Sequence, residues 1–241
     1  MVALSALLSL ADVSVRFPNA TALADVSLEV AASELVVVWG PARSGRTTLL
    51  EVAAGVRVPA SGMVRFDGRP ASDGLGRRGG FALMTADGHS LLGHEDLVIE
   101  QVAYPAIRMM SRWRAQAAAD GALRRCGVEE LAQERMSTLS AAERVRVLLA
   151  RSLVREPRLV LMDEPTIGLS HTEGERFIQL VRSLVRDDGI SVLMTDDAEG
   201  AALVPGARVL TMQRGTLRGA GPAPPADVIP LGDRRAGPGF G

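Results

Sequence analysis

The stretch LSAAERVRVLLARSLVREPRLVLMDEPTIGLS, residues 139–170, decides the fold of this chain. It contains Leu159 to Met162, an apolar run of four residues between two prolines. Such a run is too short for a helix and predicts a buried strand. The strand ends on the acidic pair Asp163-Glu164, and open α/β sheets bind ligands at the carboxyl ends of their strands. Because carboxylates are seldom buried alone, the pair predicts a cationic partner at this edge of the sheet.

A second motif, GPARSGRT at residues 40–47, follows another apolar run, Leu35 to Trp39. It has the phosphate-loop spacing G-x-x-x-x-G-K-[ST], with Arg46 at the lysine position. Its glycines allow a tight turn whose N–H groups face an anion, and the helix that opens near Thr47 adds the positive end of its dipole. The Thr47 hydroxyl and Asp163 on the neighbouring strand are then predicted to hold one Mg²⁺.

In order and spacing, these motifs resemble the nucleotide-binding subunit of ABC transporters. An LSGGQ-like turn, Leu139 to Glu143, precedes the acidic strand, and Ser140 lies 23 positions before Asp163, which is the family spacing. The resemblance covers nearly everything from Leu7 to Leu217. It implies an α/β fold with a P-loop NTPase core, a mixed and mainly parallel sheet, an antiparallel β subdomain and an inserted α-helical subdomain.

The resemblance also implies how the chain is divided. We expect an ABC-type nucleotide-binding domain over residues 1–218, with the helical subdomain at about residues 85–138. The 117 residues between Arg46 and Asp163 leave room for this insertion. Residues 219–241 are rich in Pro and Gly and poor in apolar side chains, so we expect a disordered tail.

The spacing of apolar residues predicts the individual elements. Strands are expected at Leu7 to Phe17, Ala24 to Val30, Glu34 to Trp39, Met63 to Asp67, Phe81 to Met84, Leu159 to Met162, Ser191 to Thr195, Ala207 to Met212 and Thr216 to Arg218. Helices are expected at Thr47 to Gly55, Leu97 to Met110, Arg112 to Cys126, Val128 to Ala132, the segment after the signature turn, Glu173 to Asp187 and Asp197 to Val204. An exposed loop is expected at Asp73 to Gly80, and a polar connection at Gln133 to Thr138.

Composition limits the possible partners. With 241 residues, 47% of them hydrophobic, the chain can bury a full core, and its net charge of −1 argues against a nucleic-acid partner. All 27 basic residues are Arg, so the general use of Arg in place of Lys in this chain can account for Arg46. Met1 to Leu10 lacks the charged start of a signal peptide, and no apolar run reaches 18 residues. The single Cys126 is expected to be buried, in a reducing compartment.

The family arrangement implies the site residues. In this arrangement two subunits hold two nucleotides between them, and each nucleotide lies between the phosphate loop of one subunit and the signature turn of the other. The resemblance implies that ATP is bound by Phe17, Gly40, Arg43, Ser44, Gly45, Arg46, Thr47, Thr48 and Ser140, with Mg²⁺ held by Thr47 and Asp163. Phe17 lies where the family places an aromatic that stacks on adenine, although core packing is an equal alternative. Glu164 lies at the position of the general base that accepts a proton from water, the alternative being a solvated charge at a strand end.

Five departures from the family pattern point to a weakened catalytic half. They are Arg46, the absence of the glutamine after Phe81 to Met84, Ala141 with Ala142, Ser170, and Asp196 in place of the switch histidine. A guanidinium on a longer stem cannot replace a compact ammonium between two phosphates. A carboxylate at position 196 repels a triphosphate unless it is protonated or bridged by a cation. If either alanine needs φ > 0, it costs roughly 1 kcal/mol.

Three further residues remain open alternatives. Asp87 is a weak candidate for approaching the ion in place of the missing glutamine. Arg43 replaces a residue that is often Gly, and its side chain can simply face solvent. His171 is expected at the surface.

Two segments and one residue indicate a branch of the family. Leu91 to His94, Gln101 to Pro105 and Glu143 look most like the lipoprotein-release and macrolide-export branch. In the family the helical subdomain meets the cytoplasmic helices of the transporter, so we expect a dock for a membrane partner around Leu91 to Tyr104. The alternative there is an ordinary amphipathic helix face.

The leading hypothesis is an ATP-binding subunit that binds Mg-ATP, with hydrolysis weak or lost. Its expected partners are an integral membrane permease and a second ATP-binding subunit, in a homo- or heterodimer, and its expected place is cytoplasmic, on the inner face of the cell membrane. One alternative is a nucleotide-independent scaffold, and another is a fully active exporter ATPase that uses Arg46 in place of Lys. A DNA-repair ATPase is disfavoured because no long heptad insertion interrupts the helical region.

Overall fold

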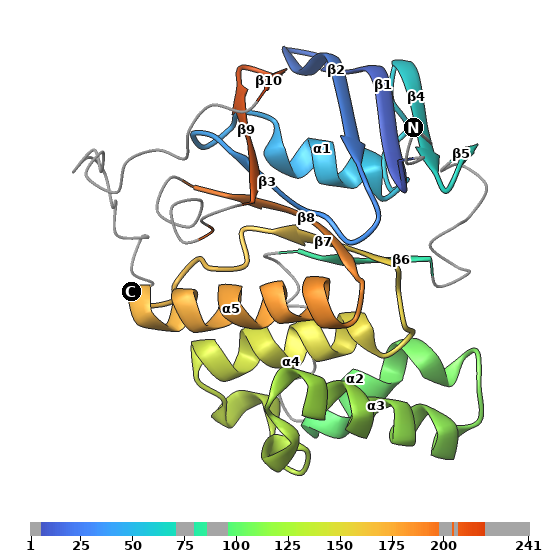
Figure 1. Cartoon of the computed structure of the whole chain (residues 1–241), viewed down its shortest axis with the longest axis vertical. Coiled ribbons are helices and arrows are strands. Elements are labelled where there is room, and N and C mark those ends of the chain that lie inside the picture. The colour runs from blue at the N-terminus through green and yellow to red at the C-terminus, as the bar shows by residue number, and fades with distance from the viewer. Residues whose placement is uncertain (1–5, 71–79, 86–95, 198–203, 205–206, 220–241) are drawn as a thin grey trace.

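Two sheets enclose a helix in the computed structural model, which describes residues 6–70, 80–85, 96–197, 204 and 207–219 (Figure 1). The larger sheet has the strand order β10-β9-β3-β8-β7-β6, and every neighbouring pair in it is parallel except β9 with β10. Its strands are β3 (Leu35–Trp39), β6 (Phe81–Met84), β7 (Leu159–Asp163), β8 (Ser191–Asp196), β9 (Arg208–Gln213) and β10 (Thr216–Arg218).

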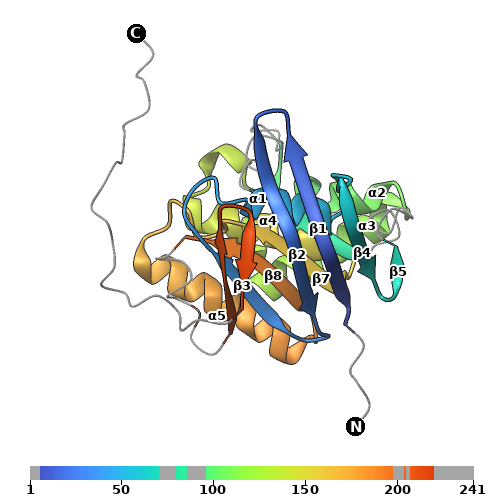
Figure 2. The ribbon, with the colours of Figure 1, turned by 90° about the horizontal axis from the view of Figure 1, so that it is seen from above.

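The smaller sheet is antiparallel and has the order β2-β1-β4-β5. Its strands are β1 (Leu8–Phe17), β2 (Ala20–Val30), β4 (Ser61–Phe66) and β5 (Arg69–Pro70). Figure 2 shows β1 and β2 as two long adjacent strands, with β9 and β10 beside them.

The helices lie in two places. Helix α1 (Arg46–Ala53) lies between the two sheets, and the remaining helices lie on the other side of the larger sheet (Figure 1). They are α2 (Val98–Ile107), α3 (Arg112–Cys126), α4 (Ala141–Leu153) and α5 (His171–Asp187), with 3₁₀ turns at Glu129–Leu131 and Met136–Thr138.

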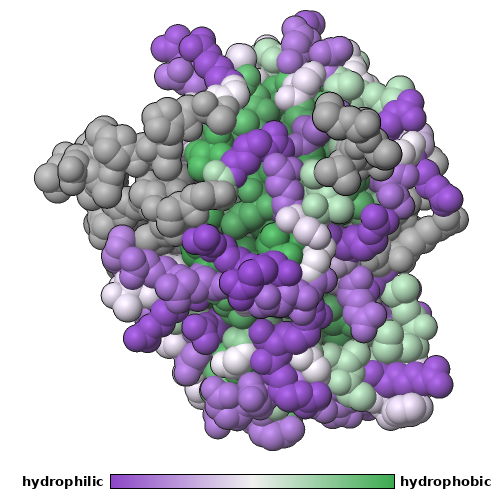
Figure 3. All heavy atoms as spheres, viewed as in Figure 1, coloured by the Kyte–Doolittle hydropathy of each residue, from purple (hydrophilic) through white to green (hydrophobic). Residues whose placement is uncertain are grey.

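Alternating side chains of the larger sheet divide the core in two. In β7, Leu159 and Leu161 pack with α1 and the antiparallel sheet, whereas Val160 and Met162 pack with the helices below. Successive strand residues point to opposite faces, so each inner strand serves both clusters. In the space-filling view, hydrophobic residues gather over the sheet and the helices below present mainly hydrophilic side chains (Figure 3). The parallel strands therefore read as continuous apolar runs in the sequence because both of their faces are covered.

Two helices begin with the same capping arrangement. The Ser140 hydroxyl accepts a hydrogen bond from the Glu143 amide at 3.3 Å, and the Glu143 carboxylate accepts one from the Ser140 amide at 2.8 Å. Ser170 and Glu173 repeat this capping box at the start of α5. Such a box satisfies two amide donors that the helix itself leaves free, and therefore sets where α4 and α5 begin.

The predicted fold class is confirmed, and the differences in element bounds are local. Strand β2 starts at Ala20 rather than Ala24, because Phe17 pairs directly with Ala20 across a two-residue turn. Helix α2 ends at Ile107 rather than Met110, and the amides of Met109 and Met110 both donate to the Ala106 carbonyl in the turn that follows. The helix predicted at Val128 to Ala132 is only a 3₁₀ turn.

Several predictions lie wholly or mainly outside the described residues. They are the loop at Asp73 to Gly80, Asp87, the segment Leu91 to His94, the helix at Asp197 to Val204 and the tail at 219–241. Within the residues that the structure does describe, no helix combines the length and the apolar character needed to cross a membrane.

Candidate functional site

The candidate site lies at the carboxyl ends of three adjacent parallel strands. Register pairs Trp39 of β3 with Asp196 of β8, and Thr195 of β8 with Asp163 of β7. The residues that follow β3 and β7 are the phosphate loop and Glu164. Sheet geometry therefore brings together motifs that are more than a hundred residues apart in the chain.

The phosphate loop has a backbone that only glycine tolerates at two points. A Cβ on Gly40 would lie 2.2 Å from the carbonyl oxygen of Met212, and one on Gly45 would lie 2.3 Å from that of Ala22. Gly45 also has a φ of 110° and is the N-cap residue of α1. The Leu49 amide donates to the Gly45 carbonyl at 2.9 Å, which is the first hydrogen bond of the helix. The amides of the first turn before Leu49 have no acceptor within the helix and can therefore bind an anion.

Neighbouring turns hold this loop in place. The Gly215 amide, in the turn between β9 and β10, donates to the Ser44 carbonyl at 2.8 Å. The Gly215 carbonyl accepts from the Ala24 amide of β2 at the same distance. The loop is thereby linked to both sheets, which favours a preformed anion site.

A pocket opens over the loop and contains most of the predicted nucleotide residues. It is lined by Phe17, Ala20, Thr21, Ala22, Ala42, Arg43, Ser44, Gly45, Arg46, Thr47, Thr48 and Glu164. The pocket thus joins the tip of the β1–β2 hairpin, the phosphate loop and the acidic strand end.

Ser44 gives an independent sign that the pocket takes a polar ligand. Only 3% of Ser44 is exposed, and its buried hydroxyl has no hydrogen-bond partner within the described part of the chain. A buried hydroxyl without a partner costs about 1–3 kcal/mol. A ligand oxygen that enters the pocket beside it would remove this cost.

Arg46 is turned toward protein groups at the floor of the site. Its guanidinium donates to the carbonyl oxygens of Gly40 and Asp196, the latter at 2.6 Å, and forms an ion pair with the Glu164 carboxylate. The Arg46 side chain is buried and that of Glu164 is partly buried. Glu164 itself has a φ of 47°, an uncommon backbone conformation for a residue with a side chain. The predicted phosphate cation and the predicted general base are therefore bonded to each other.

Asp163 lies beneath the pocket rather than on its wall. It is buried, and its Oδ1 accepts a hydrogen bond from the Thr195 hydroxyl at 2.5 Å. Thr47, the other predicted magnesium ligand, is exposed and lines the pocket. Within the described ranges, no group of three or more His, Cys, Asp or Glu side chains is arranged to hold a metal ion. The residues present could supply two oxygen ligands, and the remaining ligands of an ion would come from nucleotide and water.

Asp196 takes the switch-histidine position as a buried and fully bonded carboxyl group. It is 2% exposed, and its oxygens accept hydrogen bonds from the Thr166 hydroxyl at 2.8 Å and the Asp197 amide at 2.9 Å. Burial raises the pKa of Asp196 to about 7, the two hydrogen bonds oppose this, and the nearby Asp197 and Glu164 charges add to it. Asp196 is therefore partly protonated at neutral pH, which reduces the expected repulsion of a triphosphate.

Phe17 and Ser140 have different relations to this pocket. Phe17 is 41% exposed and lines it, so the alternative of core packing is wrong. Ser140 caps α4 and is not one of the lining residues, which agrees with the expectation that a signature turn serves the other subunit. Ala141 and Ala142 both lie in α4 and neither has a positive φ, so the backbone penalty considered for them does not arise.

The remaining predictions concern the rim and the core. Arg43 is exposed at the pocket rim with a φ of 63°. His171 is at the surface as expected, 3.5 Å from Glu175. Cys126 is buried as expected, and burial raises the pKa of its thiol to about 12.

Comparison with known proteins assigns the family. The model of the ABC transporter family matches residues 23–167, which include the phosphate loop, the signature turn and the acidic strand. The chain belongs to the ABC transporter family. Its relatives include the lipoprotein-releasing system ATP-binding protein LolD of Bordetella pertussis, which is 38% identical over 204 residues covering 81% of this chain and 87% of LolD.

Other similarities extend the comparison of this ABC transporter domain. The Fe(3+) ions import ATP-binding protein FbpC of Streptomyces coelicolor is 35% identical over 215 residues, or 89% of this chain. The chain spans 62% of the length of that protein. The dimeric structure of a bacterial ABC transporter cassette superposes with a TM-score of 0.75 and 26% identity, covering 88% of this chain and 96% of the cassette. Both its sequence and its fold therefore place the domain in the family.

Four residues of the site could not be found from the sequence. Thr166 and Thr195 bond the two buried aspartates, and Glu51 and Arg57 support Phe17 from outside the pocket. Thr166 lies within the stretch 139–170, but its bond to Asp196 cannot be seen in that stretch, and the other three lie outside the quoted motifs. Each acts through a contact that only the folded chain creates.

Proposed function

We propose that this chain is the ATP-binding subunit of an ABC transporter and that it binds Mg-ATP in the phosphate-loop pocket. The observation that carries this proposal is the preformed loop, which glycines at two close contacts shape. Its Ser44, whose buried hydroxyl has no partner among the described residues, lines the pocket. A protein that kept this fold only as a scaffold would have no need of such a loop. The names of its relatives, which are ATP-binding proteins of import and release systems, support the same function.

The magnesium ligands follow from the same motifs. Thr47 and Asp163 are the residues that would hold Mg²⁺, and the ion, when bound, would neutralise part of the phosphate charge. Asp163 is positioned by the Thr195 hydroxyl, whose hydrogen bond leaves the second carboxylate oxygen available. We propose that this chain retains the binding half of the family site.

Hydrolysis is proposed to be weak because Arg46 engages Glu164. A general base must reach the proton that it removes, and the Glu164 carboxylate is instead paired with a guanidinium that never loses its charge. The same guanidinium is held by the carbonyls of Gly40 and Asp196, so its fork is directed to the protein and not to a phosphate. Binding without efficient turnover is the expected outcome.

The chain is further proposed to work in a membrane complex. Its partners would be an integral membrane permease and a second ATP-binding subunit, and it would lie on the cytoplasmic face of the cell membrane. In this assignment residues 1–218 form the ABC-type unit, with the helical subdomain at about 85–138 and the tail outside it.

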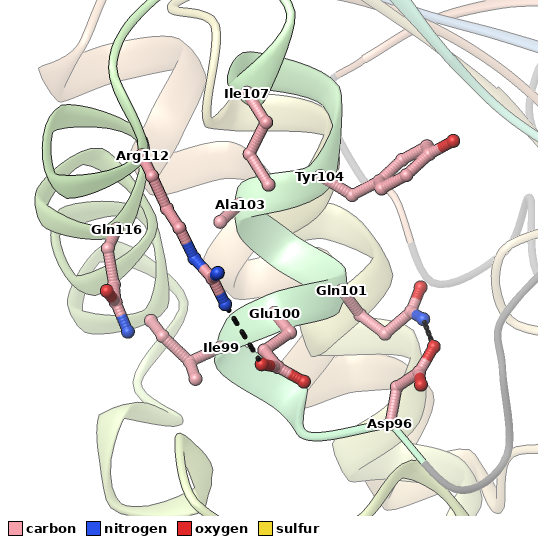
Figure 4. A pocket seen from close by; sticks show the side chains of 9 residues that line it. All are labelled: Asp96, Ile99, Glu100, Gln101, Ala103, Tyr104, Ile107, Arg112 and Gln116. Atoms are coloured by element: carbon pink, nitrogen blue, oxygen red, sulfur yellow. Dashed lines mark hydrogen bonds and ion pairs between the residues drawn. The ribbon is translucent and has the colours of Figure 1, made fainter.

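The proposed dock for the permease is the surface of α2. A hollow there is lined by residues of α2 and α3, and in Figure 4 the Tyr104 side chain points away from Arg112 and Gln116 of α3. Tyr104, Ile107 and Trp113 are all exposed, although they are large and apolar. The hollow is bordered by a Gln101–Asp96 hydrogen bond and a Glu100–Arg112 ion pair. An apolar patch with a polar rim is typical of a protein interface.

The test of nucleotide function compares binding with phosphate release. Purified protein is titrated with a fluorescent ATP analogue and Mg²⁺, and phosphate release is measured in wild type and in Arg46→Lys. We expect binding by both, with little release by wild type. We expect release to rise at least about ten-fold in Arg46→Lys, because an ammonium cannot form the same fork to Glu164.

Two further variants make this result specific. Arg176→Lys is the matched control, because it makes the same chemical change at an exposed position of α5 outside the pocket, and it should leave release unchanged. Glu164→Gln added to Arg46→Lys should abolish the gain. Vigorous release by wild type that Glu164→Gln abolishes would refute the weakened site, and no binding at millimolar nucleotide would favour a scaffold.

A further inference from the structure

Phe17, Arg57 and Glu51 form a chain of contacts beside the nucleotide pocket. The guanidinium carbon of Arg57 lies 4.8 Å from the centroid of the Phe17 ring, within the range of a cation–π interaction. The Arg57 Nε donates a hydrogen bond to the Glu51 carboxylate at 2.6 Å. The ring is therefore held by a cation that is itself held by a carboxylate.

The Phe17 ring is shared between the pocket and the Arg57 cation. Phe17 lines the pocket together with the phosphate loop, whereas among the described residues neither Arg57 nor Glu51 does. A ring has two faces, and Arg57 covers one of them. Arg57 leaves the other face of the ring uncovered, and 41% of Phe17 is exposed.

Backbone contacts fix the support as well. Glu51 lies in α1, the helix that leaves the phosphate loop, and its carbonyl accepts hydrogen bonds from the amides of Val56 at 2.9 Å and Arg57 at 3.1 Å. Glu51 therefore holds both the main chain and the side chain of Arg57. This arrangement couples the end of β1, where Phe17 lies, to the helix that follows the phosphate loop.

An exposed aromatic side chain at a strand end would otherwise be free to change rotamer. Ordering such a ring when a ligand binds costs conformational entropy, and a support that orders it beforehand lowers that cost. The guanidinium attracts one face of the ring electrostatically and leaves the opposite face available for stacking on another planar group.

We propose that Arg57, held by Glu51, is a positioning residue that fixes the Phe17 ring as the stacking platform for the nucleobase. This inference rests on the proposed nucleotide binding. It adds a specific consequence, because Arg57 then contributes to recognition of the base and not of the phosphates. Its loss should weaken ligands that carry a base and spare ligands that do not.

The experiment compares Mg-ATP with Mg-tripolyphosphate by isothermal titration calorimetry. In Arg57→Ala, the affinity for ATP should fall about two- to five-fold, the range expected for losing an exposed cation–π contact, and that for tripolyphosphate should stay unchanged. Arg57→Lys should retain most of the ATP affinity, because an ammonium can also lie over the ring. Glu51→Gln should give an intermediate loss. Unchanged tripolyphosphate binding also shows that each variant is folded.

Arg176→Ala is the matched control. It removes the same charge from an exposed position in α5, on the other side of the larger sheet, and should change neither affinity. An equal loss of ATP and tripolyphosphate affinity in Arg57→Ala would overturn the inference, because it would mean that Arg57 acts through charge alone. An unchanged ratio of the two affinities would overturn it too. If wild type bound neither ligand, the proposed function would fail, whereas ATP binding insensitive to Arg57 would defeat only this inference.

Discussion

At position 46 a guanidinium stands where the family pattern has an ammonium. Its planar fork carries several donors, and in this chain it reaches two carbonyls and the Glu164 carboxylate at once. Each of these acceptors belongs to the edge of the sheet where a triphosphate would lie. Arg46 thus supplies positive charge to the pocket and also pairs with Glu164, the carboxylate that would serve as the general base.

Asp196 provides a residue-scale prediction about pH. Because burial raises its pKa to about 7, above its value in an unfolded chain, the native state binds a proton that the unfolded state releases. The free energy of unfolding should therefore be highest below about pH 4 for this group, fall as the pH rises toward 7, and level off above it. Asp196→Asn should remove this fall and be more stable at pH 8 than wild type, by an amount on the order of a few kcal/mol.

Urea unfolding at several values between pH 5 and pH 8 measures this effect. Glu130→Gln, at an exposed carboxylate in the 3₁₀ turn after α3, is the control and should keep the wild-type pH dependence. A wild-type stability that does not change across this interval, or an Asp196→Asn variant with the same slope, would show that Asp196 is ionised in the native protein.

At the scale of elements, the three inner strands position the site and link the two core clusters. Strands β3, β7 and β8 place their carboxyl ends together, and the alternating side chains of each fill two different clusters. The capping boxes at Ser140 and Ser170 then fix where α4 and α5 leave the loops that surround the site. Ser170, one of the departures from the family pattern, therefore has a structural role as a helix cap.

Strand β7 gives an element-scale prediction. Leu161 and Met162 are neighbours in sequence but belong to the two opposite clusters, and both are fully buried. Leu161→Ala and Met162→Ala should each lower the free energy of unfolding by about 2–5 kcal/mol. Because the strand is shared, each variant should still unfold in one transition, which circular dichroism in urea can follow.

Val58→Ala is the control for these variants, because Val58 is 85% exposed and its truncation should change stability by less than about 0.5 kcal/mol. If Met162→Ala divided unfolding into two steps, the helices and the antiparallel sheet would be independent units, contrary to the shared strand.

At the scale of the whole molecule, the layers separate two tasks. The nucleotide pocket lies between the hairpin tip and the end of the larger sheet, whereas the exposed apolar side chains of α2 and α3 belong to helices on the other side of that sheet (Figure 1). A transport subunit must connect nucleotide binding with a membrane partner. In the proposed function, separate surfaces of one fold serve these two tasks.

The proposed dock supplies the whole-molecule prediction. Tyr104→Glu places a charge in the apolar patch and should reduce co-purification with a co-expressed permease partner at least about ten-fold, since a Tyr that a partner buries is often a hot spot. Binding of Mg-ATP should be unchanged, because Tyr104 lies outside the pocket.

Met63→Glu is the control for this variant. Met63 is also exposed and apolar but lies in β4 of the antiparallel sheet, so the variant should co-purify like wild type. If both variants lost the partner equally, the effect would come from general solubility and not from a dock on α2.

The fold and much of the site were predictable because their signals are local. The run Leu159 to Met162 predicted β7, and the glycine spacing of residues 40–47 predicted the loop that shapes the pocket. The end of α2 was less predictable, because neither Gly nor Asn, the usual signals of a helix end, follows Ile107. The role of Ser170 as the cap of α5 becomes visible only in the structure, although the sequence marks it as a departure from the family pattern.

The sequence by itself determined where the strands, the phosphate loop and the acidic pair lie, because these depend on neighbouring residues and on the alternation of apolar side chains. Only the tertiary structure decided what those groups touch. The Arg46–Glu164 ion pair joins residues 118 positions apart, and the Arg57 contact with Phe17 joins two elements that no motif relates. Side-chain partners across such separations depend on how strands align and helices pack, which sets distances that no local pattern contains.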